Sequence, residues 1–109
     1  MAGLRFGDAK LAYEIQYSPE AEEHLRALNA RQRAIVLDEV DELLAHQPTV
    51  ESRNQKPMRP NPVAPWELRI GELRVYYDVQ EQPDQKVTIA AVGIKHRNRV
   101  RIGGEEVTW

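Results

Sequence analysis

The first residues of the chain alternate between apolar and polar positions and then change period. Residues 11–17 (LAYEIQY) place apolar side chains at every second position, which predicts a half-buried strand. Ser18 and Pro19 follow directly and favour a helix start, because serine caps a helix N-terminus and proline fits the first helical turn. The pattern therefore predicts a strand that leads into a helix.

Two helices are predicted beyond this point, because the apolar spacing changes to three or four residues. The first ends near Asn29, a residue type that tolerates the left-handed conformation found at helix ends. The second runs from about Arg31 to His46 and is stopped by Pro48. The expected buried positions of both helices are Ala21, Leu25, Leu28, Ile35, Val36, Val40, Leu43 and Leu44. This helical hairpin is apolar on one side only, so another layer must cover it.

The second half of the chain supplies that layer. Residues 53–65 hold four of the seven prolines and are expected to form an extended connection. Strand-like runs follow at residues 66–70, 73–79 and 86–94, and a two-residue turn at 71–72 joins the first two of them. The apolar side of this antiparallel meander is expected to hold Trp66, Leu68, Ile70, Leu73, Val75, Tyr77, Val79, Val87, Ile89 and Ala91.

The predicted fold class is α+β: an N-terminal strand and a helical hairpin packed on a small antiparallel sheet of about four strands. The length of 109 residues fits a single domain, 1–109, in which residues 1–10 and 102–109 are peripheral tails.

Composition excludes several function classes. The chain has no cysteine, which removes disulfides and thiolate zinc sites and fits a reducing cytoplasm. Its start lacks the apolar run of a signal peptide, and the longest uncharged apolar stretch, residues 87–94, is too short to span a membrane. No phosphate-binding glycine motif is present, and the three histidines are scattered. We therefore expect a cytoplasmic protein with no metal, no cofactor and no membrane partner.

The charge is divided unevenly along the chain, although the formal net charge is only −2. Residues 1–52 hold 5 Lys and Arg against 10 Asp and Glu, whereas residues 53–101 hold 10 against 5. The second half could form an electropositive face that meets phosphate, or the two halves could simply attract each other.

Two arginines are expected to point away from the apolar side of the sheet. A two-residue turn at 71–72 pairs Arg69 directly with Arg74, and Glu67 with Tyr76. Like charges in a cross-strand pair destabilise a sheet by up to about 1 kcal/mol, and a bound polyanion would offset this cost. The alternative is that Glu67 and Glu72 neutralise the pair on an ordinary solvated surface.

The densest basic run, Lys95-His96-Arg97-Asn98-Arg99-Val100-Arg101, follows the last predicted strand. It would extend the arginine pair into a patch that holds several phosphates. His96 is the one side chain of the patch whose usual pKa suits proton transfer near neutral pH, or it is an ordinary surface histidine. His24 and His46 lie on predicted helices and are expected to be structural.

The order of these elements resembles the RelE/ParE superfamily of bacterial toxins. Residues 66–77 (WELRIGELRVYY) are similar to the central hairpin of that family, and residues 91–97 (AVGIKHR) to its last strand and basic turn. Residues 17–21 (YSPEA) resemble the junction that opens its first helix. The resemblance covers about residues 13–101.

The resemblance implies the toxin of a type II toxin–antitoxin pair, held inactive by a cognate antitoxin. RelE-like members cleave mRNA on the ribosome through attack of the RNA 2′-hydroxyl on the adjacent phosphate. On that basis we expect inhibition of translation by ribosome-dependent mRNA cleavage. The resemblance implies Arg74 and either Lys95 or Arg97 as phosphate-contacting residues, and Arg69 as a further arginine of the family pattern. The candidate catalytic residues are Arg74 and Lys95, together with His96 and Glu67 from the sequence itself. The candidate nucleic-acid-binding residues are Arg69, Arg74, Lys95, Arg97, Arg99 and Arg101.

The sequence departs from the active RelE pattern at three positions. Pro65 and Glu67 stand where that pattern has lysines, and Arg101 stands where it has a catalytic tyrosine. Glu67 could still serve as a base and His96 as an acid, so the enzyme would be an endoribonuclease with an incomplete catalytic set. The alternatives are a ParE-like toxin that inhibits DNA gyrase without a nuclease activity, and a weakened toxin that mainly binds its antitoxin.

Overall fold

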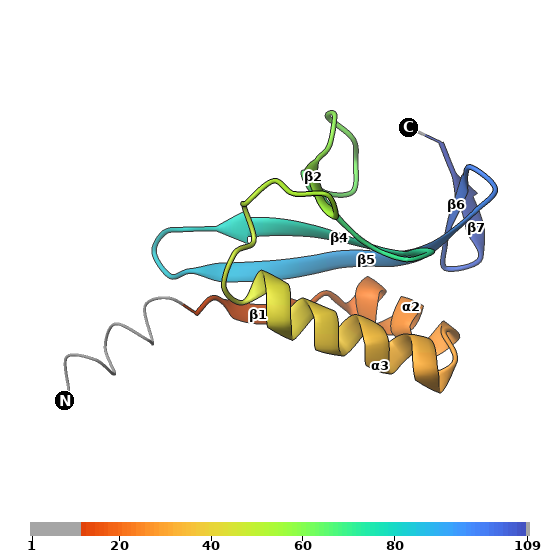
Figure 1. The fold of residues 1–109 in the computed structure, drawn as a ribbon, viewed down its shortest axis with the longest axis horizontal. Helices are drawn as coiled ribbons and strands as arrows, with labels where there is room; N and C mark the ends of the chain where they lie inside the picture. Colours follow the sequence, from red (N-terminus) through yellow and green to blue (C-terminus); the bar gives the residue numbers. More distant parts are fainter. Residues whose placement is uncertain (1–11, 109) are drawn as a thin grey trace.

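The computed structural model describes residues 12–108, in which helices lie on one face of a single sheet (Figure 1). The helices and strands of these residues are β1 (Glu14–Tyr17), α2 (Pro19–Ala27), α3 (Ala30–Glu39), the π-helical turn η1 (Val40–Leu44), β2 (Gln55–Pro57), β3 (Trp66–Ile70), β4 (Leu73–Gln80), β5 (Lys86–His96), β6 (Arg99–Ile102) and β7 (Glu105–Val107). The predicted α+β class is confirmed. The tail expected at residues 1–10 lies outside the described residues.

The two helices form where the sequence predicts them. Ser18 caps α2, since its hydroxyl accepts a hydrogen bond of 3.0 Å from the Ala21 N–H. Asn29 takes a different role from the one expected: its backbone is extended, and its side chain caps α3 by accepting a 2.7 Å bond from the Gln32 N–H. Asn29 therefore begins the second helix instead of ending the first in a left-handed conformation.

The sheet is larger than expected and is not wholly antiparallel. Within residues 12–108 it has seven strands, in the order β2-β3-β4-β5-β6-β7, with β1 paired to β5. β1 runs parallel to β5, whereas the other pairs are antiparallel. The prediction of about four antiparallel strands missed β2, β6 and β7, which have 3, 4 and 3 residues. Residues 105–107, assigned to a tail, thus form an edge strand.

The main core lies between the helices and one face of the sheet. Val36 of α3 and both Val40 and Leu44 of η1 are fully buried there, together with Leu68 and Val75 of the hairpin. We call the opposite side of the sheet the helix-free face. A second, smaller core lies on it, where Ala64 packs against Tyr76 and Ala91.

A β-bulge in β5 decides which side chains reach each face. Tyr77 pairs with Ile89 but Tyr76 pairs with Ala91, so Ala90 is the additional residue of the bulge. Because one extra residue reverses the alternation, Ala91 lies on the helix-free face and Val92 in the main core. The prediction that Ala91 continues the helix-covered face was wrong for this reason.

Side chains of the first helix bind the bulged segment along its other edge. β1 leaves that edge of β5 after Ile89, and β6 joins it at Gly93. In the gap between them, the Ser18 hydroxyl donates to the Ala90 carbonyl at 3.0 Å, and the Val92 N–H donates to His24 Nδ1 at 3.2 Å. Two side chains therefore replace the missing backbone partners of this segment.

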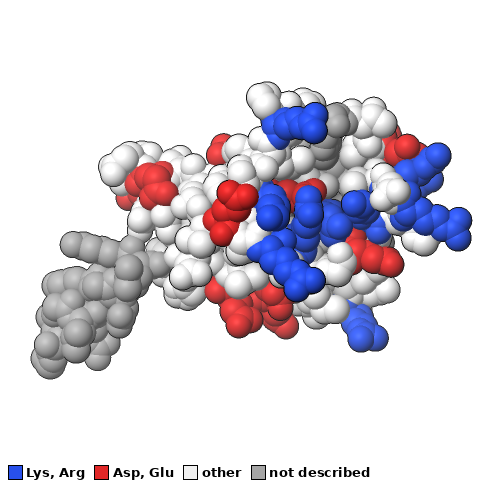
Figure 2. All heavy atoms as spheres, turned by 45° about the horizontal axis from the view of Figure 1, so that its top comes forward, with Lys and Arg blue, Asp and Glu red and all other residues white. Residues whose placement is uncertain are grey.

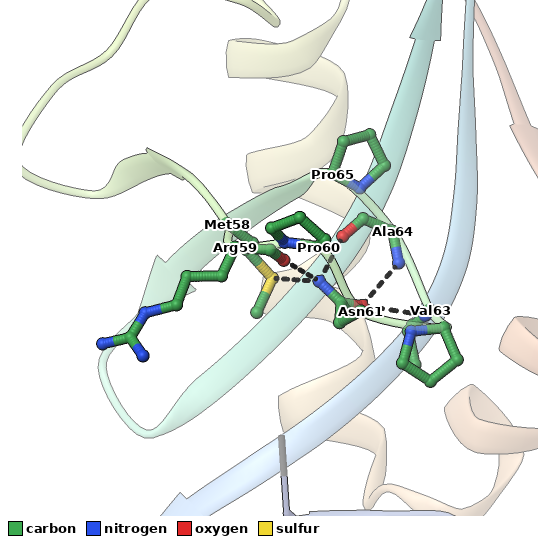
Figure 3. Close-up of a pocket in the computed structure, with 8 residues that line it drawn as sticks. Met58, Arg59, Pro60, Asn61, Val63, Ala64 and Pro65 are labelled. Carbon is green, nitrogen blue, oxygen red and sulfur yellow. Dashed lines mark hydrogen bonds between the residues drawn. The ribbon is translucent and has the colours of Figure 1, made fainter.

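The proline-rich connection crosses the helix-free face in a fixed conformation. Its first part is β2, which pairs with β3. Asn61 organises the rest: its amide nitrogen donates to the carbonyls of Arg59 and Ala64 at 2.7 and 2.9 Å, and its oxygen accepts from the Val63 and Ala64 N–H groups (Figure 3). The connection is extended, as predicted, but it also forms a strand of the sheet.

In residues 12–108, no helix is long and apolar enough to cross a membrane.

The His24 contact predicts that stability depends on pH. Burial lowers the pKa of His24 below its usual 6.5, against the opposing charges of Glu20 and Glu23, and the protonated ring could not accept the Val92 bond. Since the folded-state pKa is lowered, His24 favours folding above about pH 6.5 and this contribution is lost as the pH falls.

We expect His24→Gln to reduce the fall in unfolding free energy between neutral and mildly acidic pH, measured by urea denaturation monitored by circular dichroism. The control is His46→Gln, because His46 is exposed. Parallel pH profiles for wild-type protein and His24→Gln would contradict this role of His24.

Candidate functional site

The β3–β4 hairpin has the register that the sequence predicts. Ile70 pairs with Leu73 across the two-residue turn, and Arg69 pairs with Arg74. Gly71 has a φ of +59°, which glycine adopts without the steric cost that a side chain would add. The hairpin therefore places two arginines side by side on the helix-free face, next to Glu67 and Tyr76.

Glu67 is engaged with its neighbours through one of its carboxylate oxygens. It is 8% exposed, and one of its carboxylate oxygens accepts a 2.8 Å hydrogen bond from Arg69 Nε. Burial raises the pKa of Tyr76, and the charge of Glu67 and a hydrogen bond to it raise that pKa further. A carboxylate shared between a guanidinium and a buried phenol is held in one position.

Arg74 is buried beneath the hairpin turn. It is 8% exposed, and its Nη1 donates to the carbonyls of Gly71 and Leu73 at 2.7 and 2.9 Å. Among residues 12–108 it forms no ion pair. Its charge is therefore stabilised by two peptide dipoles, and part of the guanidinium is used to fasten the turn.

The basic run at residues 95–101 is divided between the two faces of the sheet. Beyond the bulge, Lys95 lies on the helix-free face, where it is a diagonal neighbour of Arg74. His96 alternates to the other face and lines a hollow beside α2 together with Arg101. Arg97 and Asn98 form the turn into β6, with φ values of +52° and +67°.

Two arginines of this run have partners on the last hairpin. Arg99 pairs with His96 across the strands, and its Nη1 lies 3.2 Å from a carboxylate oxygen of Glu106. The Nη1 of Arg101 donates to the Gly104 carbonyl at 3.4 Å. The structure thus brings Glu67, Arg69, Arg74 and Lys95 together, but it separates His96, Arg99 and Arg101 from them.

Two cations of the site were missed by sequence analysis. Lys56 lies on β2 directly opposite Glu67, and Arg59 follows in the proline-rich connection. With Glu67 and Arg69 they line a hollow of about 410 Å³. The run Gln55-Lys56-Pro57 is too short to give more than a weak strand signal for this edge of the hairpin.

The cations form a band across the helix-free face. Figure 2 shows Lys and Arg side chains gathered there, with a few carboxylates among them. Register places one cation on each of four neighbouring strands: Lys56, Arg69, Arg74 and Lys95. This band is the candidate functional site. Among the described residues, no group of three or more His, Asp or Glu side chains is placed to hold a metal ion.

Comparison with known proteins identifies the family to which this fold and site belong. Residues 15–101 match the model of the ParE toxin of the type II toxin–antitoxin system parDE. The chain therefore belongs to the ParE toxin family, within the RelE/ParE superfamily that the sequence resembles.

Solved structures agree with this assignment. A chain of the toxin–antitoxin complex RelBE2 from Mycobacterium tuberculosis is similar to this one, with a TM-score of 0.67 and 25% sequence identity. The match covers 81% of this chain and 94% of that chain. A search of curated proteins returned no match.

The bonds of Arg74 predict a large effect of a conservative substitution. Lysine cannot reproduce the geometry of the guanidinium, so we expect Arg74→Lys to lower the unfolding free energy by about 1–2 kcal/mol. The matched control is Arg97→Lys in the exposed turn, expected to change it by less than about 0.5 kcal/mol. Thermal and urea denaturation measure both variants. Equal effects of the two substitutions would show that Arg74 does not fasten the turn.

Proposed function

We propose that this toxin acts by binding a protein target, DNA gyrase, and not by cleaving RNA. The observation that carries the proposal is the separation of the groups a nuclease would need. Glu67, the candidate base, is bonded to Arg69, and His96, the candidate acid, lies on the other face of the sheet from Arg74.

Cleavage of RNA by its own 2′-hydroxyl requires a base and an acid on either side of one phosphate, with cations beside it. A base must be within hydrogen-bond reach of the proton that it removes. Glu67 is 8% exposed and Arg74 is 8% exposed, so neither is presented openly to a phosphate. The match to the ParE family model also favours the branch without nuclease activity.

Ribosome-dependent mRNA cleavage, the activity first expected from the sequence, is the competing function. The adjacent arginines Arg69 and Arg74 and the similarity to a chain of the RelBE2 complex favour it. Under this alternative, Glu67 would have to leave Arg69 when RNA binds. A weakened toxin that mainly binds its antitoxin is the third possibility.

We further propose that a cognate antitoxin binds the toxin and holds it inactive. The similar RelBE2 chain was solved in a toxin–antitoxin complex, and this supports an antitoxin as partner. Gyrase and the ribosome both work in the cytoplasm, so the proposed site of action is cytoplasmic.

Two assays on the same purified toxin test the proposed target. We expect the toxin to inhibit supercoiling of relaxed plasmid by gyrase, and addition of the antitoxin to restore it. We expect mRNA on a programmed ribosome to stay intact at equimolar toxin. Relaxation of the same plasmid by a type I topoisomerase is the control.

Cut mRNA together with normal supercoiling would overturn the proposal in favour of the nuclease. Normal supercoiling together with intact mRNA would also overturn it, in favour of the weakened toxin.

A further inference from the structure

One end of the band of cations borders a hollow between the proline-rich connection and β3, and gyrase binding alone does not explain this hollow. Its lining includes Lys56, Arg59 and Arg69, with Glu67 as the only carboxylate and Pro57, Met58 and Pro60 as apolar neighbours. Three cations and one carboxylate give these residues a net charge of +2.

The cations of the hollow keep donors available. The Nε of Arg69 donates a hydrogen bond to Glu67, so the two terminal nitrogens of Arg69 remain as donors for a ligand. The Arg69 side chain is 46% exposed. Lys56 and Arg59 form no ion pair with any residue between 12 and 108. The lining carries more positive than negative charge, so a bound anion would be stabilised by it.

The walls of the hollow are held in place before any ligand binds. β2 is paired with β3, and the Met58 N–H donates to the Pro65 carbonyl at 2.8 Å. The Asn61 side chain holds the loop together through hydrogen bonds with the backbone of Ala64, whereas the Arg59 side chain extends away from the loop (Figure 3). Because the backbone is already fixed by these bonds and by its prolines, little backbone entropy is lost on binding.

We propose that this hollow binds a phosphate monoester. Such a group carries a charge of about −1.5 to −2 at neutral pH, which matches the net charge of the lining, and guanidinium groups hold phosphate oxygens in a two-pronged geometry. A volume of about 410 Å³ also leaves room for the group attached to the phosphate, which would lie against Pro57, Met58 and Pro60.

The same phosphate chemistry can come from two sources: a free nucleotide, or the phosphorylated end of a nucleic acid. The site includes Arg69 of the arginine pair but not Arg74, which is turned toward the carbonyls of Gly71 and Leu73. It is also independent of the gyrase proposal, since its test measures ligand binding and not supercoiling.

Isothermal titration calorimetry on the whole protein tests the site with uridine 5′-monophosphate and with uridine. A short RNA is titrated in two forms, with a 5′-phosphate and with a 5′-hydroxyl. We expect the nucleotide or the phosphorylated RNA to bind, and uridine and the hydroxyl form not to bind. Binding of the nucleotide alone identifies a free ligand as the source, and binding of the phosphorylated RNA identifies a nucleic-acid end.

Three variants connect the binding to this hollow. Lys56→Met should weaken it about tenfold, because one charged hydrogen bond is lost. Glu67→Gln should strengthen it several-fold, since a repelling charge is removed. Lys86→Met, a lysine on β5 that does not line the hollow, should leave the affinity within about twofold. Circular dichroism verifies that each variant is folded.

The proposal is overturned if neither phosphate form binds, or if both RNA forms bind equally, which would indicate the nucleic-acid backbone. It is also overturned if polyglutamate displaces the nucleotide at similar concentration, which would indicate an acidic peptide. Equal effects of Lys56→Met and Lys86→Met would place the binding elsewhere.

Discussion

The bulge at Ala90 is the constraint on which the functional surface depends. Without it, Tyr76 would pair with Ala90, and the even-numbered residues that follow would point to the helix-free face. His96 would then lie on the same side as Arg74. The additional residue reverses this alternation, so Lys95 takes that side and His96 faces the helices. One residue in the middle of the longest strand thus decides which charged groups can act together.

The first helix takes part in this arrangement through its side chains. Ser18 caps the helix and also donates to the Ala90 carbonyl, while His24 accepts from the Val92 N–H. Gly93 is required for close approach, since a Cβ at this position would lie 2.6 Å from the Arg101 carbonyl oxygen. Local contacts of α2 and β6 therefore fix the bulged strand from the edge opposite β4, and the division of the basic run follows from them.

The hairpin and the helices could be predicted from the sequence because their signals are local. A two-residue turn with Gly71 fixes the register of its strands, so the Arg69–Arg74 and Glu67–Tyr76 pairs were correctly placed. The bulge could not be predicted in this way. Ala90 and Ala91 are small and apolar and fit either face of the sheet. The apolar run around them therefore gives no sign that the alternation of side chains reverses at the bulge.

Other features were missed because they depend on partners distant in the sequence. Periodicity identifies β1 as a strand but says nothing of its direction, and only the completed sheet makes it parallel to β5. β2 is three residues long and includes Pro57, so it carries almost no strand signal, although it brings Lys56 opposite Glu67. The part of the site that lies on the β3–β4 hairpin was therefore predicted from the sequence. The part that β2 contributes, Lys56, was missed because it comes from a separate segment.

Nuclear Overhauser contacts across β4 and β5 test this account most directly. Opposed residues in antiparallel strands have Cα atoms about 4.5–5.5 Å apart, so their backbone protons give distinct cross-strand signals. The bulged register predicts contacts of Tyr77 with Ile89 and of Tyr76 with Ala91. A contact of Tyr76 with Ala90 in uninterrupted register would contradict it, because His96 would then join Arg74 on one face.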